Sequence, residues 1–441
     1  MQYKKYEFPS FNVYTIKNDK FKSCHMEIIY RDKADKNTLL ERSLIADIIS
    51  SSSKKFPKQK DVVIKKEELY RTTFYGVTSR IGNTTATNFI LNFINPTYAL
   101  EKDFLEEVLK FPFEMLSNPN AENEEFDNRI FTIIKNNYKD SIKAIKENPN
   151  KLAIREALNT MDPDSPTGYG LLNSEDHLND LTSSMLYKSY KKMLKTSLCD
   201  IFIIGNLDMD KVVKIIEKNF KNRAIKTYDV NLFVDNTNRK KPIEASKDSK
   251  FVQSNLLMIY NLNDLTKRER DMVFQIFNYI FGNGSLNCKL TRYLREENSL
   301  CYSVNSMYMK YDKLLMVKVS LAKENIKIAT ELITKALKEM QTGKFTEEEI
   351  NDAKTNLISG TNVSLDNPIS ILDNYVFNVY DNIFLLEDRI KEIKNITKEE
   401  IVTLANKIKL NTTFVLNEGD NWYARNRNKR FRWKDLLRKV R

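Results

Sequence analysis

One order of predicted elements occurs twice in this sequence, and that repetition restricts the possible folds more than any single motif. Residues 24–30 and 254–260 each predict a strand by their apolar alternation, and an apolar helix follows each strand, over 39–50 and 268–281. A further strand, an amphipathic helix, a long helix and a closing helix–strand pair then follow in the same order in each half. This order predicts an α+β fold of two tandem homologous domains, each a mostly antiparallel sheet packed with helices.

The length of the chain agrees with two such domains. A chain of 441 residues is too long for one ordinary hydrophobic core. The stretch 221–248 is polar and has Asn-Thr-Asn-Arg-Lys-Lys-Pro at its centre, which is typical of a linker. We therefore expect a first domain over 1–220, a linker over 221–248, a second domain over 249–420 and a separate tail over 421–441.

The basic excess of the chain is concentrated in this tail. Residues 421–441 contain nine Lys or Arg against Asp435 alone, a net charge of +8, which leaves +4 of the total +12 for the other 420 residues. The sequence has no recognised nucleic-acid module, so a nucleic-acid partner is not expected. Aromatic and basic residues are interleaved in the tail, which leaves two interpretations: a solvated end, or a segment that docks on an acidic partner surface or an anionic membrane.

The ends and the apolar stretches of the sequence predict a cytoplasmic protein. Residues 1–20 have no apolar core after their basic residues, unlike a secretory signal. No apolar stretch approaches the ~18 residues needed to cross a bilayer, and the longest, 272–281, is interrupted by Gln275 and Asn278. The four cysteines are scattered, which indicates reduced thiols and no metal or redox motif.

Two segments of the second half carry a family resemblance. A Gly-rich turn over 281–285 precedes the segment 290–304, which contains Leu-Arg-Glu and then Leu-Cys-Tyr-Ser, and residues 345–354 begin a helix with a capping box between Thr346 and Glu349. These segments resemble the pitrilysin, or insulinase-like, metallopeptidases, the inverted zincins that include mitochondrial-processing-peptidase-like proteins. The resemblance covers most of the chain and implies the same tandem α+β fold.

The zinc motif of that family is missing. Its members bind zinc through the two histidines of H-x-x-E-H and a later glutamate, and the motif glutamate is the base for the metal-bound water. This chain has only two histidines, His25 and His177, and they are too far apart in the sequence to form the motif. The resemblance therefore implies a chain without zinc or catalytic residues of its own.

An alignment on residues 53–57 identifies what replaces the motif. It places Ser43 and Asp47 at the two histidine positions and Ala46 at the base position, and the later glutamate falls near Asn128. A zinc site improvised from Asp47 and nearby glutamates is disfavoured because soft ligands are absent.

Arg295 and Tyr302 stand where the resemblance implies substrate binding. In family members split into two polypeptides, the non-catalytic subunit supplies an arginine and a tyrosine that hold the peptide against the partner's zinc. A guanidinium can donate to peptide carbonyls, and a phenol can donate where charge develops. Read without the resemblance, Arg295 could be the solvated edge of a helix and Tyr302 a strand residue that faces a core.

The resemblance implies a non-catalytic, substrate-positioning subunit of a heterodimeric zinc peptidase. The expected partner is a paralogue that bears H-x-x-E-H and holds the zinc, and the expected substrate is a small peptide that is degraded or processed, including maturation of a secreted or modified peptide. The alternative is a purely structural or scaffold member of the family with no role in proteolysis.

Overall fold

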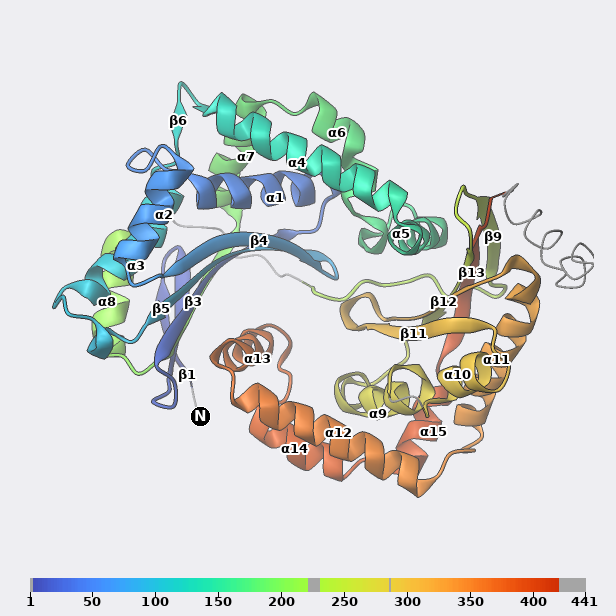
Figure 1. The fold of residues 1–441 in the computed structure, drawn as a ribbon. Coiled ribbons are helices and arrows are strands. Elements are labelled where there is room, and N and C mark those ends of the chain that lie inside the picture. The colour runs from blue at the N-terminus through green and yellow to red at the C-terminus, as the bar shows by residue number, and fades with distance from the viewer. Residues whose placement is uncertain (1–2, 221–230, 285–286, 420–441) are drawn as a thin grey trace, which may run out of the picture.

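The protein contains two mixed sheets, one in each half of the chain, with helices packed against them (Figure 1). The structure, a computed structural model, describes residues 3–220, 231–284 and 287–419. The tail 421–441 and the first part of the expected linker lie outside these residues. The predicted α+β class, with mostly antiparallel sheets covered by helices, is confirmed.

The first sheet has six strands, of which only β2 and β8 pair in parallel. Its spatial order is β1 (Tyr3–Phe8), β2 (Phe11–Lys17), β8 (Leu198–Gly205), β3 (Ser23–Lys33), β5 (Thr84–Ile94) and β4 (Thr73–Ile81). The helices of this half are α1 (Lys36–Ser51), α2 (Gln59–Glu68), α3 (Phe104–Ser117), α4 (Asn128–Glu147), α5 (Pro149–Met161), α6 (Glu175–Asp180), α7 (Ser183–Thr196) and α8 (Met209–Asn219). A short hairpin joins β6 (Ala121–Glu122) to β7 (Glu125–Phe126) before α4.

Local sequence explains where the principal helices begin. The side chains of Asp35, Asp127 and Thr182 accept hydrogen bonds from the first backbone N–H groups of α1, α4 and α7, which have no partner within the helix. The apolar faces of α1, α3, α7 and α8 then bury one face of the first sheet, including Met26 and Ile28.

The second sheet repeats the strand order and polarity of β4, β5, β3, β8 and β2. Its order is β11 (Cys301–Met309), β12 (Leu314–Leu321), β10 (Ser254–Asn261), β13 (Lys409–Asn417) and β9 (Ile243–Asp248), and only β13 and β9 pair in parallel. The sequence places 243–248 in the linker, but these residues form a strand. Their polar side chains fit an edge strand, because its outer side faces water.

The helices of the second half are more irregular. α9 (Phe274–Asn278) lies between two π-helical turns, Glu269–Val273 and Tyr279–Asn283, and α10 (Lys289–Thr291) continues into a third, Arg292–Glu296. The remaining helices are α11 (Ile326–Gln341), α12 (Glu347–Leu365), α13 (Pro368–Asp381), α14 (Leu386–Lys394) and α15 (Lys398–Asn406). The predicted capping box of Thr346 and Glu349 is confirmed at the start of α12.

Each half also contributes one helix that packs on the sheet of the other half. α13 packs on the first sheet, where Leu372 and Tyr375 contact a core that contains Phe202 and Ile204 (Figure 1). α5 packs in the same way on the second sheet, where Ala157 belongs to a core with strands β10, β12 and β13. The two halves therefore share two of their four apolar cores.

Candidate functional site

Helix α1 carries the residues that replace the zinc motif. Ser43 and Asp47 lie one turn apart and face α4, where the Tyr138 hydroxyl donates a hydrogen bond of 3.0 Å to Asp47 Oδ2. Burial raises the pKa of Asp47, and the hydrogen bond from Tyr138 opposes that shift. Asn128 does not join this group, because it is exposed in the first turn of α4.

Ala46, at the position of the catalytic base, is buried against β4. A Cβ atom added to Gly76 of that strand would lie 2.7 Å from the Ala46 carbonyl oxygen and 2.9 Å from Ala46 Cβ. The helix therefore approaches the strand so closely that no side chain larger than a methyl group fits between them. The position has no room for a glutamate.

These residues do not fit a zinc ion. Of the four motif positions only Asp47 offers a side chain of the carboxylate, imidazole or thiolate type, whereas a catalytic zinc site needs three. In the part of the chain that the structure describes, no group of three or more His, Cys, Asp or Glu side chains is arranged to hold a metal.

The structure brings Arg295 and Tyr302 together on the surface. Tyr302 lies on β11, an edge strand, and its side chain is 88% exposed. The guanidinium carbon of Arg295 is 5.6 Å from the Tyr302 ring centroid, a cation–π distance, and Arg295 Nε lies 3.1 Å from Glu296 Oε1. The alternative that Tyr302 faces a core is wrong, and both polar groups are accessible to a ligand from outside.

The Arg295–Tyr302 pair and the replaced zinc motif do not form one site within the chain. Figure 1 shows α1 in the first half, well separated from α10 and β11 in the second half. Any joint action of an arginine–tyrosine pair with a zinc site therefore requires a second polypeptide.

Two features near the replaced motif were not predicted. Tyr138 is one, although its signal was present: Phe131, Ile134, Tyr138 and Ile142 recur at helical spacing and form the inner face of α4. The other is an open cavity of about 420 Å³ beside Ser43, lined by residues of α1, α4, α5, the end of β4 and the segment 169–174. Its walls come from segments distant in sequence, so no local pattern could reveal it.

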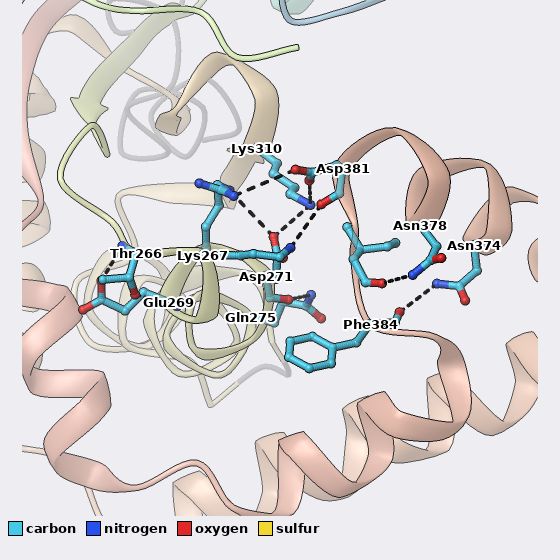
Figure 2. A network of polar contacts seen from close by, with 12 residues as sticks. Thr266, Lys267, Glu269, Asp271, Gln275, Lys310, Asn374, Asn378, Asp381 and Phe384 are labelled. Carbon is cyan, nitrogen blue, oxygen red and sulfur yellow. Dashed lines mark hydrogen bonds and ion pairs between the residues drawn. The ribbon is translucent and has the colours of Figure 1, made fainter. Parts of the chain in front are cut away.

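A buried ionic cluster fixes the far end of α13, as Figure 2 shows. Lys310 Nζ lies 2.9 Å from Asp271 Oδ1 and 2.7 Å from Asp381 Oδ2, and Lys267 also pairs with Asp271. Arg270 lies 3.7 Å from Asp271 and 4.0 Å from Asp381, so three cations surround the two buried carboxylates. Nearby, the Asn374 side chain donates to the Phe384 carbonyl oxygen at 3.1 Å and closes the turn after the helix. This cluster ties the end of α13 to Lys310 and to the segment 267–271.

The two-sheet fold and the replaced motif positions indicate a peptidase-like chain that lacks the zinc ligands of H-x-x-E-H. Residues 180–357 match the family model described as the Peptidase M16 inactive domain. The chain is 24% identical over 406 residues to the probable inactive metalloprotease YmfF of Bacillus subtilis (strain 168), a match that covers 91% of this chain and 94% of that protein.

Solved structures share the fold. A conserved protein from Enterococcus faecalis V583 matches with a TM-score of 0.89 and 23% identity, over 95% of this chain and 99% of that one. The peptidase M16 inactive domain from Pseudomonas fluorescens matches with a TM-score of 0.76 and 16% identity, over 95% and 98%. These findings confirm the pitrilysin-like resemblance: the chain is similar to inactive members of the M16 peptidases. None of the helices that the structure describes is long and apolar enough to span a bilayer.

Proposed function

We propose that the protein is the non-catalytic, substrate-positioning subunit of a heterodimeric zinc peptidase that processes or degrades small peptides. The observation that carries this proposal is the exposed Arg295–Tyr302 pair in a chain whose zinc-motif positions hold Ser43, Ala46 and Asp47. A chain that serves only as a scaffold has no need of an exposed tyrosine beside a guanidinium.

The chemistry of the pair suits a peptide. The Arg295 guanidinium has several N–H donors in a rigid fork, so it can donate to more than one peptide carbonyl while it keeps its contact with Glu296. The Tyr302 hydroxyl can donate to an oxygen on which charge develops in the partner's active site. Both groups orient a substrate, and neither supplies the attacking water.

The proposed partner is a paralogous subunit that carries H-x-x-E-H and the zinc, and the proposed setting is the cytoplasm. The matching topology of the two sheets supports the view that each subunit arose by tandem duplication, so that two subunits would enclose a chamber from four similar domains. The basic tail 421–441 would dock on an acidic surface of the partner or on an anionic membrane, and its deletion should then weaken that association most at low salt.

The decisive experiment purifies this chain alone and together with the H-x-x-E-H paralogue, and measures zinc content and peptide hydrolysis. We expect zinc and activity only in the preparation with the paralogue. Arg295→Ala and Tyr302→Phe should each lower peptide turnover by about 10- to 1000-fold, because each removes a donor to the substrate. Zinc content should not change.

Matched variants separate substrate contact from a general surface effect. Arg292 has the same exposed side-chain fraction as Arg295, 40%, and its own ion pair with Glu297, so Arg292→Ala should leave turnover within about twofold. Tyr98→Phe is the control for Tyr302→Phe, since Tyr98 is also exposed. Zinc or hydrolysis in the isolated chain would overturn the proposal, and full activity of the Arg295 and Tyr302 variants would favour the scaffold alternative.

A further inference from the structure

The cavity beside the replaced zinc motif contains an arginine, Arg155, that forms no ion pair with a carboxylate among the described residues. Arg155 projects from α5 into this space of about 420 Å³, which is within the size range of small-ligand sites. The one hydrogen bond that the described residues give its guanidinium runs from an Nη atom to the Tyr169 carbonyl oxygen at 3.1 Å. Most of its N–H donors therefore remain available to a ligand.

The other cation of the cavity is already neutralised. Arg80, from the end of β4, forms a bidentate pair with Asp312 of the second half, at 2.7 and 3.0 Å. Asp312 also accepts from the Thr167 hydroxyl at 2.7 Å, so its oxygens have little capacity left for Arg155. No Asp or Glu is among the described residues that line the cavity. Burial and the charge of Arg80 lower the pKa of Arg155, and the Asp312 carboxylate offsets only part of that shift.

The guanidinium of Arg155 is held in position by backbone. A Cβ atom added to Gly170 would lie 3.0 Å from the guanidinium carbon, so the flat group packs directly against this glycine. Together with the bond to the Tyr169 carbonyl, this contact fixes the direction of the free donors. A fixed guanidinium fork binds a carboxylate with two parallel hydrogen bonds, and little rotational freedom is lost on binding.

We propose that this cavity binds the carboxylate of a peptide, with Arg155 as the residue that recognises it. The proposal rests on the proposed function for the choice of a peptide as ligand, but it concerns a separate cavity in the first half and needs no catalytic partner. The carboxylate can come from the C-terminus of the peptide or from an acidic side chain. The Ser43 and Tyr138 hydroxyls on the cavity wall donate to Leu39 and Asp47, so their oxygens can accept from N–H groups of the peptide.

The test measures binding to the isolated full-length chain by fluorescence anisotropy, with three labelled hexapeptides of alanine and glycine. One has a free C-terminus, one has an amidated C-terminus, and one has an amidated C-terminus and a single internal glutamate. We expect at least one carboxylate peptide to bind about tenfold more tightly than the neutral peptide, and the one that does so identifies the source. Arg155→Gln should abolish this difference.

Two further variants test the placement of the Arg155 guanidinium and control for the loss of charge. Gly170→Ala keeps the charge but displaces the guanidinium, so it should also weaken carboxylate binding, and this prediction holds even if Arg155→Gln does not fold. Arg71→Gln removes the same charge from an 86% exposed side chain of the same half and should change nothing. Equal binding of all three peptides, an absence of binding, or carboxylate binding that persists in both Arg155→Gln and Gly170→Ala would overturn the proposal. Because no hydrolysis is measured, these outcomes are independent of the paired peptidase.

Discussion

Asp47 and Tyr138 form the contact that occupies the place of a zinc site. The Asp47 carboxylate is partly removed from water, and the Tyr138 hydroxyl donates to it at 3.0 Å. It forms no ion pair with any cation in the part of the chain that the structure describes. Desolvation disfavours the charged form, and one neutral hydrogen bond compensates for only part of that cost. The hydrogen bond links α1 to α4 and favours the ionised carboxylate, but the burial of that charge costs more than the bond returns.

The pKa shift of Asp47 has a definite consequence for stability. The pKa is raised in the folded state, so the proton binds more tightly there, and stability falls as pH rises from below the ordinary aspartate value of about 3.9 through the raised value. Asp47→Asn still accepts from Tyr138 and carries no charge. We expect it to raise the free energy of unfolding at pH 7, with a gain that disappears below about pH 4. Urea unfolding at several pH values measures this difference.

A second variant tests how much the Tyr138 hydrogen bond contributes to stability. Tyr138→Phe removes the donor and should lower the free energy of unfolding at pH 7 by about 1 kcal/mol. Tyr98→Phe, at an exposed position, should stay within about 0.5 kcal/mol of the parent. A gain from Asp47→Asn that is the same at pH 4 and pH 7 would show that charge is not responsible.

At the scale of single residues, the sequence predicts which side chains replace the zinc motif, but not which residues contact them. The lack of H-x-x-E-H is a property of the sequence alone, so the absence of a histidine pair on α1 could be predicted. The partner of Asp47 could not, because the choice between Asn128 and Tyr138 depends on how α4 packs on α1. The surroundings of Arg155 could not be predicted either, because they depend on the pairing of Asp312, from the other half, with Arg80.

Among the elements, the contact of α1 with β4 depends on one glycine. Gly76→Ala would force its methyl group against the Ala46 backbone, and we expect a loss of about 1–3 kcal/mol in the free energy of unfolding. Gly360 in α12 provides the control, since among the described residues no atom outside its own turn of helix lies within 4 Å of its added Cβ atom. Gly360→Ala should stabilise the protein by about 0.4–1 kcal/mol through lower backbone entropy in the unfolded chain. Equal effects of the two variants in chemical denaturation would contradict this account.

The strands and helices with strong periodicity were predictable, and the exceptions have physical causes. The strands around 24–30 and 254–260 follow from apolar alternation, and they form β3 and β10. β9 was missed because a polar edge strand has the composition of a linker. The three π-helical turns of the second half could not be predicted, because no local pattern in their sequence distinguishes them from α-helix.

At the scale of the molecule, the exchanged helices α5 and α13 join the two halves. Each helix covers apolar residues on the sheet of the other half, and the Arg80–Asp312 pair crosses between them in a largely buried position. Neither sheet can bury both of its faces with the helices of its own half alone. The halves should therefore unfold together, although the sequence suggested two separate domains joined by a linker.

A core substitution on α13 tests this coupling across the halves. Leu372 is fully buried against the first sheet, so Leu372→Ala should lower the free energy of unfolding by about 2–5 kcal/mol. Hydrogen exchange should accelerate at the Phe202 and Ile204 amides of β8, in the first half, as much as in β10 of the second half. Val363→Ala, at a 68% exposed position of α12, should leave exchange unchanged. Faster exchange confined to one sheet would mean that the halves unfold independently, and α13 would then be a surface contact between separable domains.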